Sequence, residues 1–243
     1  DTGNPASGVA SVTANVSALT PGQTAAPLVA GSFTVAGVAY NRRTASLTVR
    51  NPLAPGGLTY SVTTADVAGN TQTTSGLGVT VDNTAPAATD VQTANVGSLV
   101  ATAQLSDTIT FTTGEPLDPE SILAGWTGAS ANVVVRINNV GGSDTLQVFN
   151  STNTTQLNLG TVTLGSTAYV TANRTFGLTG TPSTMVRSGN TITVTLGTAS
   201  GAVTTAPANG TMSWAPSTAA YDRAGNAMSA TAATETGAAD REF

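Results

Sequence analysis

Apolar and polar residues alternate with a period of two along most of the 243-residue chain, and no long stretch has helical periodicity. Such alternation is typical of strands that bury one face of a sheet. Glycine and proline separate the apolar segments, for example at Pro21-Gly22 and Gly69-Asn70. Many short strands with turn residues between them predict antiparallel β-sandwiches.

The expected strands fall into two groups. The first group comprises residues 9–19, 32–39, 45–49, 58–65 and 76–81. The second comprises residues 98–105, 108–113, 132–137, 145–149, 158–164, 168–172, 191–196, 211–214 and 227–234. One short helical turn is expected at residues 118–123, with Asp118 as its cap and Pro119 in its first position.

The segment VDNTAP at residues 81–86 separates the two groups and predicts two domains, residues 1–84 and 85–243. The pentapeptide Asp-x-Ala-Gly-Asn occurs near the end of each domain, at residues 66–70 and 222–226. A polar turn that recurs in this way indicates two modules of related architecture. The predicted fold class is therefore all-β, with two tandem antiparallel Ig-like β-sandwiches.

Composition excludes several kinds of chemistry. The chain has no cysteine and no histidine, and all eight of its basic residues are arginine. Disulfides, Cys-ligated zinc, lysine Schiff bases and the usual neutral-pH general base are therefore ruled out. The net charge of −5 argues against nucleic acid as a partner. No apolar run approaches the roughly 20 residues of a membrane span. We expect no enzymatic activity.

Residues 1–84 resemble the bacterial Ig-like repeats of large surface proteins and adhesins. The matching segments are SGVASV at residues 7–12, YSV at 60–62 before the first pentapeptide, and VDNTAP. Residues 85–243 resemble the Ig-like domains of S-layer proteins, through DTITF at 107–111, EPLD at 115–118 and YDRAGN at 221–226. The resemblance implies a secreted structural module of the cell surface: a stalk, an adhesin or a fibre subunit. Its partners would be other copies, neighbouring Ig-like domains, or a host or matrix ligand.

One departure from the surface repeats concerns the beginning of the first domain. In those repeats one or two strands precede the Ser-Gly-Val-Ala segment, whereas here only six residues precede it. We therefore expect the first sandwich to lack its opening strand or strands. Three explanations stay open: the chain is a piece of a longer one, a neighbouring subunit supplies the strand head to tail, or the sandwich is a compact variant.

The resemblance also suggests a Ca²⁺ site between the domains. In an Ig-like sandwich the second pentapeptide faces the preceding domain, which would place Asp222 and Asn226 near Asp82 and Asn83, with Asp118 at the same pole. Oxygen ligands of this kind suit Ca²⁺, and related adhesins stiffen their linkers with it. The alternative is that the aspartates only accept backbone hydrogen bonds within their own turns.

Two further groups of residues have a functional and a structural interpretation. Glu115, Asp118 and Glu120 are the one group that suits acid–base catalysis, but the prolines between them favour a structured turn. Trp126 lies in a loop-like context and is a candidate platform for a sugar ring, as Trp214 is to a lesser degree; core packing is the alternative. The alternative function is accordingly a carbohydrate- or ligand-binding accessory module, or an Ig-like decoration domain of a phage.

Overall fold

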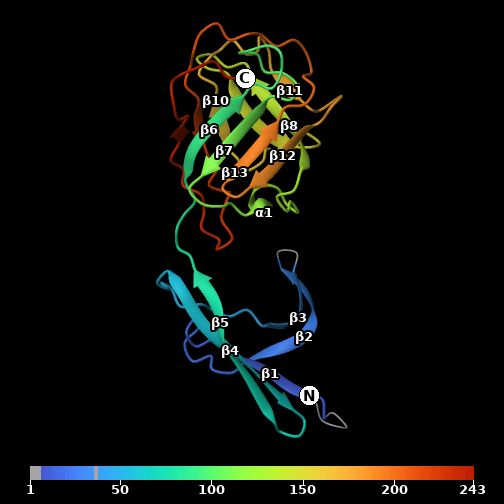
Figure 1. Cartoon of the computed structure of the whole chain (residues 1–243), viewed down its shortest axis with the longest axis vertical. Helices are drawn as coiled ribbons and strands as arrows, with labels where there is room; N and C mark the ends of the chain where they lie inside the picture. Colours follow the sequence, from blue (N-terminus) through green and yellow to red (C-terminus); the bar gives the residue numbers. More distant parts are fainter. Residues whose placement is uncertain (1–6, 36–37) are drawn as a thin grey trace. The chain divides into compact units, whose positions relative to one another are not determined.

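The computed structural model describes residues 7–35 and 38–243 and divides the chain into an N-terminal unit, residues 1–83, and a C-terminal unit, residues 84–243 (Figure 1). Strands make up 44% of the chain and helix 2%, which confirms the predicted all-β class. Each unit has its own antiparallel sheet and its own buried cluster.

The N-terminal unit is a five-stranded antiparallel sheet in the order β3-β2-β1-β4-β5 (Figure 1). Its strands are β1 (Val9–Asn15), β2 (Ala26–Val35), β3 (Val38–Thr44), β4 (Gly56–Asp66) and β5 (Thr71–Val81). The strand predicted at residues 32–39 is instead the junction of β2 and β3, and its residues 36–37 lie outside the described residues.

This unit buries little apolar surface. Among its described residues the buried cluster consists of Ala14, Val16 and Ala26, with half-buried neighbours around it, namely Leu19, Leu28, Leu47, Tyr60 and Val62. β5 is exposed along almost its whole length. A sandwich core needs two facing layers, and the described residues of this unit supply only one.

Residues 45–49 were expected to be a strand of this unit, and this prediction is wrong. They alternate in the way a strand does, yet they pair with no other strand, and Val49 is 48% exposed. A strand needs a neighbour for its backbone groups. Leu47 packs against the buried cluster, so side-chain contact rather than strand pairing holds this segment.

The C-terminal unit has ten strands: β6 (Ala88–Ala94), β7 (Thr108–Thr113), β8 (Ala131–Asn138), β9 (Thr145–Asn150), β10 (Thr161–Thr163), β11 (Arg174–Phe176), β12 (Ser183–Ser188), β13 (Thr191–Thr195), β14 (Ser213–Ala215) and β15 (Ala233–Thr234). Their order is β15-β14-β10-β9-β8-β12-β13-β7-β6, and β11 pairs with β8. The one helix described, α1 (Pro119–Ile122), has four residues. None of the described residues forms a helix long and apolar enough to cross a membrane.

The two ends of this strand order meet. Thr236, two residues after β15, donates its backbone N–H to Asp90 Oδ1 of β6 at 2.8 Å. Its carbonyl oxygen accepts from Gln92 Nε2, also on β6, at 2.9 Å. We call this junction of β15 and β6 the seam. The sheet thus curls back on itself and encloses its own core, which gives the sandwich-like architecture.

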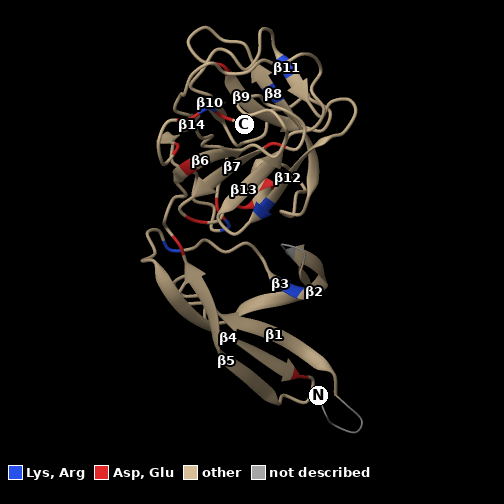
Figure 2. Ribbon diagram, turned by 45° about the horizontal axis from the view of Figure 1, so that its top comes forward, with Lys and Arg blue, Asp and Glu red and all other residues tan. Residues whose placement is uncertain are grey.

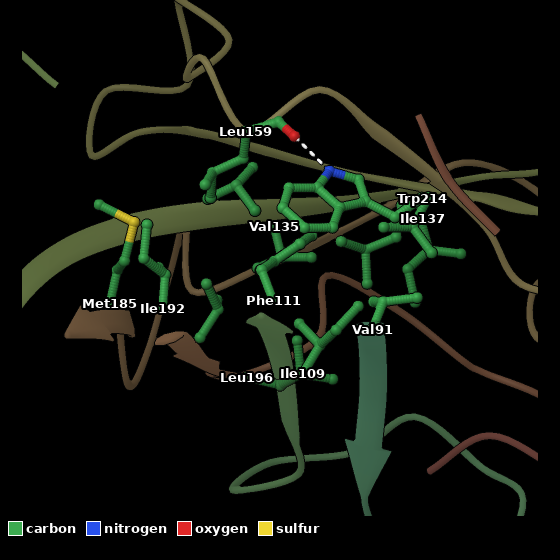
Figure 3. Packing of buried hydrophobic residues seen from close by; sticks show 14 of the residues in the cluster. Val91, Ile109, Phe111, Val135, Ile137, Leu159, Met185, Ile192, Leu196 and Trp214 are labelled. Atoms are coloured by element: carbon green, nitrogen blue, oxygen red, sulfur yellow. Dashed lines mark hydrogen bonds between the residues drawn. The ribbon is translucent and has the colours of Figure 1, made fainter. Parts of the chain in front are cut away.

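The enclosed core is large and tightly packed (Figure 3). Trp214 is fully buried and meets Phe111 edge to face, with ring centroids 5.0 Å apart. Its indole N–H donates to the carbonyl oxygen of Leu159 at 2.6 Å, so the polar end of the ring also has a partner (Figure 3). Strand alternation supplies these side chains: along β7, Ile109 and Phe111 point inward while the threonines between them are half-buried.

The strand predicted at residues 98–105 is wrong, and a buried carboxylate explains why. Asp107 is fully buried. Its Oδ1 accepts the backbone N–H groups of Val96 and Gly97 at 2.9 and 3.0 Å, and its Oδ2 accepts that of Gln104 at 2.9 Å. An aspartate that binds several backbone donors offers the chain an alternative to the strand ladder.

The same cause removes the strand predicted at residues 168–172. Asp144, also fully buried, accepts the backbone N–H groups of Tyr169 and Val170 through Oδ2 at 3.0 and 3.1 Å. These donors are therefore unavailable for strand pairing, and the segment forms a turn-rich loop.

We expect the replacement Trp214→Ala to lower the free energy of unfolding of the C-terminal unit by about 3–5 kcal/mol, because it opens a cavity at the centre of the core. Urea unfolding followed by fluorescence of the remaining Trp126 measures this loss. Val186→Ala, at a position 43% exposed in the same unit, is the control and should change stability by less than about 0.5 kcal/mol. Equal effects of the two replacements would contradict this view of the core.

Candidate functional site

The two pentapeptides form the same turn. Asp66 accepts the backbone N–H of Asn70 through Oδ1 and its side-chain amide through Oδ2, both at 2.8 Å. Asp222 accepts the same two groups of Asn226, both at 2.9 Å. The glycine before each asparagine has a positive φ, 91° and 89°, which glycine adopts without strain. The pKa of the Asp66 carboxyl lies below its usual range, and the main cause is the hydrogen bond from the side-chain amide of Asn70. Both repeats therefore have the geometry expected from the turn interpretation.

The structure brings the segment of Asp118 next to the second pentapeptide, as predicted. Asp118 caps α1, because its Oδ1 accepts the backbone N–H of Glu120 at 3.1 Å. Its own N–H donates to the carbonyl oxygen of Tyr221 at 2.9 Å. Ser121 adds a second link, since its hydroxyl donates to the same carbonyl and accepts the N–H of Tyr221. The predicted helical turn and its cap are thus confirmed.

The carboxylate that approaches Asp222 is that of Glu115. One carboxylate oxygen of each lies within 4.8 Å of the other. Asp222 is buried, at 4% exposure. Asp82 and Asn83 belong to the N-terminal unit, where the Asn83 amide donates to the carbonyl oxygen of Leu53 at 2.7 Å. A Ca²⁺ site shared by the two units stays a prediction.

Trp126 lies in the core of the C-terminal unit. Its side chain is 5% exposed, and its indole N–H donates to the carbonyl oxygen of Ala129. A sugar platform needs an exposed ring face, so this burial favours the packing interpretation of Trp126 over the ligand interpretation. Trp214 is fully buried and favours packing for the same reason.

A second group of carboxylates lies elsewhere in the C-terminal unit. Glu235, Asp240 and Glu242, which we call the C-terminal acidic cluster, each place one carboxylate oxygen within 4.8 Å of the others. The sequence offers one signal of it, namely that three of the 13 acidic residues fall within eight positions. Their spacing matches no known ligand motif, so the pattern alone does not predict that they converge.

Glu242 is the most constrained member of this cluster. It is 1% exposed; its Oε2 accepts the hydroxyl of Thr93 at 2.6 Å, and its backbone N–H donates to the hydroxyl oxygen of Tyr169 at 2.7 Å. Its Oε1 is buried and has no hydrogen-bond partner. Burial is the main cause that raises the pKa of Glu242 to about 8, and the neighbouring Glu235 and Asp240 also raise it. The hydrogen bond from Thr93 acts in the opposite direction. Burial also raises the pKa of the Tyr169 phenol, which is therefore neutral.

Comparison with known proteins adds no relative, because no protein-family model, curated protein or solved structure matches the chain. The resemblance to Ig-like surface domains thus depends on the motifs themselves. The architecture and the two carboxylate groups are what the structure contributes to an interpretation of function.

We expect Asp222→Ala to lower the free energy of unfolding of the C-terminal unit by about 1–3 kcal/mol in buffer with a chelator, because two donors of Asn226 lose their acceptor. Denaturant unfolding monitored by tryptophan fluorescence tests this, since both tryptophans belong to that unit. Arg223→Ala, an exposed position in the same turn, is the control. An effect of Asp222→Ala that appears only when Ca²⁺ is added would favour the cation interpretation instead.

The raised pKa of Glu242 predicts a pH dependence in metal-free buffer. Between its ordinary pKa of 4.5 and its folded value of about 8, the folded state holds a proton that the unfolded state has lost. The stabilisation is therefore complete below about pH 4.5 and falls as the pH rises towards 8. Urea unfolding at several pH values should show this decline for the wild type, and Glu242→Gln should flatten it. A wild-type curve that rises between pH 5 and 8 would contradict the assignment.

Proposed function

We propose that the chain is a non-enzymatic, extracellular structural module of a bacterial surface protein, and that it is built into a stalk or fibre through its N-terminal unit. The observation that carries this proposal is the sheet of that unit, which we call uncovered because its buried cluster has only three described members and, of residues 45–49, only Leu47 packs against it. Its apolar side chains are half-buried, and a strand-patterned segment beside it has no strand partner.

The uncovered sheet supplies a reason for association. Leu28, Leu47, Tyr60 and Val62 pack against only three buried residues and keep part of their surface in water. Each further square ångström of apolar surface removed from water contributes about 25 cal/mol. A second layer over this face would therefore stabilise the unit, and the smallest such layer is one or two added strands.

The backbone offers sites at which such a strand can pair. Among the described residues of the N-terminal unit, β3 and β5 are edge strands, each paired on one side. Residues 45–49 lie outside any strand ladder. Open backbone donors and acceptors of this kind accept a strand from another chain. We propose that the donor is a strand of another copy, which would join the modules head to tail.

The C-terminal unit suits the role of a rigid spacer. Its sheet closes at the seam around a dense core, so its own apolar surface is satisfied. Charged positions are sparse along the ribbon of both units (Figure 2), in keeping with a charged fraction of 9%. Of the three carboxylates first considered for catalysis, Glu115, Asp118 and Glu120, Asp118 has a structural role, since it caps α1. The burial of Trp126 removes the main support for a sugar-binding module.

We expect the purified chain to form oligomers whose mass grows with protein concentration, because strand donation between copies is a bimolecular step. Light scattering coupled to size-exclusion chromatography measures this mass. Val49→Lys places a charge in the unpaired segment, where the side chain is largely in water in the monomer, and should shift the population towards monomers. Val186→Lys, at an exposed position of the C-terminal unit, should leave the mass unchanged. A wild-type protein that stays monomeric at every concentration would refute assembly between copies.

A further inference from the structure

We propose that Glu235, Asp240 and Glu242 form a divalent-cation site, suited to Ca²⁺, that fastens the seam of the C-terminal unit. This site is separate from the one expected between the two units. It lies wholly within the C-terminal unit and does not depend on how the modules assemble.

The distances allow one ion to contact all three side chains. Ca²⁺ binds oxygen at about 2.3–2.6 Å, so two ligands on opposite sides of it lie at most about 5 Å apart. The three carboxylate oxygens of the cluster lie within 4.8 Å of one another. The chain has no cysteine or histidine, so every ligand is an oxygen, which favours a hard cation over zinc or copper.

Glu242 gives an independent indication that a ligand belongs here. Its side chain is 1% exposed, and its Oε1 is buried without a hydrogen-bond partner. The Oε1 of Glu235 is likewise buried without a hydrogen-bond partner. A buried charged oxygen without a partner is costly, and the charged neighbours that act on Glu242 are themselves acidic. A cation would satisfy both oxygens at once.

The position of the cluster explains what the ion would do. Glu235 directly follows β15, and the carboxylate of Glu242 is held by Thr93 of β6, so the cluster joins the two strands of the seam. The backbone of Asp240 is held by Gly210, whose N–H donates to the Asp240 carbonyl oxygen at 2.7 Å. An ion that binds the folded unit at this point opposes separation of β15 from β6. It therefore stabilises the whole unit by an amount that grows with the logarithm of its free concentration above the dissociation constant.

A proton shared by Glu235 and Glu242 is the competing way to satisfy these oxygens. It requires no metal, and it is favoured at low pH, whereas Ca²⁺ requires deprotonated ligands and is favoured at high pH. The two alternatives therefore predict opposite responses at pH 8: a cation site gains stability from added Ca²⁺, and a shared proton does not.

The test uses the full chain, freed of metal with a chelator and dialysed to pH 8. Adding millimolar CaCl₂ should raise the melting temperature of the C-terminal unit, followed by tryptophan fluorescence, and MgCl₂ at the same concentration should raise it less. Calorimetric titration with Ca²⁺ should show binding that Glu242→Gln weakens by about ten-fold or more. Glu120→Gln, which removes the same charge from an exposed position of α1, should bind as the wild type does.

The variant Asp240→Asn provides a second test in case Glu242→Gln, at a buried position, fails to fold. Asp240 is exposed, and its replacement removes one of three mutually repelling charges, so it should not lower the metal-free melting temperature and should still weaken Ca²⁺ binding. Two results would overturn the proposal. One is a wild-type melting temperature at pH 8 that Ca²⁺ does not change, which leaves the shared proton as the explanation. The other is a Ca²⁺ response that Glu242→Gln and Asp240→Asn retain and Asp222→Ala abolishes, which places the ion at the Glu115–Asp222 pair.

Discussion

An apolar face of a β-sheet has to be covered, and the two units meet this requirement in different ways. The C-terminal unit covers its sheet by curling it until β15 meets β6, so that Trp214, Phe111 and their neighbours pack inside. The N-terminal unit has five strands in one layer and too few apolar residues to enclose a core. One unit therefore encloses a core of its own, and the other has only a small buried cluster among its described residues, which is the basis of the proposed assembly between copies.

Buried carboxylates determine much of the loop structure in a chain that has few charges. Asp107 and Asp144 are fully buried, and each binds two or more backbone N–H groups of a loop. Asp222 accepts one backbone N–H and one side-chain amide of Asn226 in its turn. Such bonds satisfy a carboxylate away from water. Glu242 shares with Asp144 an oxygen that has no donor, and it differs from Asp144 because two other carboxylates lie next to it.

Sequence reasoning succeeded where local patterns decide the structure. β7 alternates strictly and was predicted at its observed bounds, and the cap and proline of α1 are local signals. It failed where the outcome depends on distant partners. β6 has one large apolar residue, Val91, and is a strand because β7 pairs with it. Residues 98–105 have the pattern of a strand, but Asp107 binds the backbone N–H of Gln104 and those of Val96 and Gly97 just before the segment. Convergence of Glu235 with Glu242 depends on the closure of the sheet, which no local pattern contains.

The closure of the sheet also links stability to the surrounding medium. The seam joins strands that are far apart in the sequence, so its formation carries a large loss of chain entropy. The same place concentrates three carboxylates, whose mutual repulsion opposes closure unless a proton or a cation neutralises it. Once the pH rises past about 8 this proton is lost from Glu242, and a divalent cation then becomes the stronger neutraliser. With the cation site proposed above, the unit is firmer where Ca²⁺ is abundant and looser where it is scarce. That dependence is the behaviour which the proposed extracellular spacer requires.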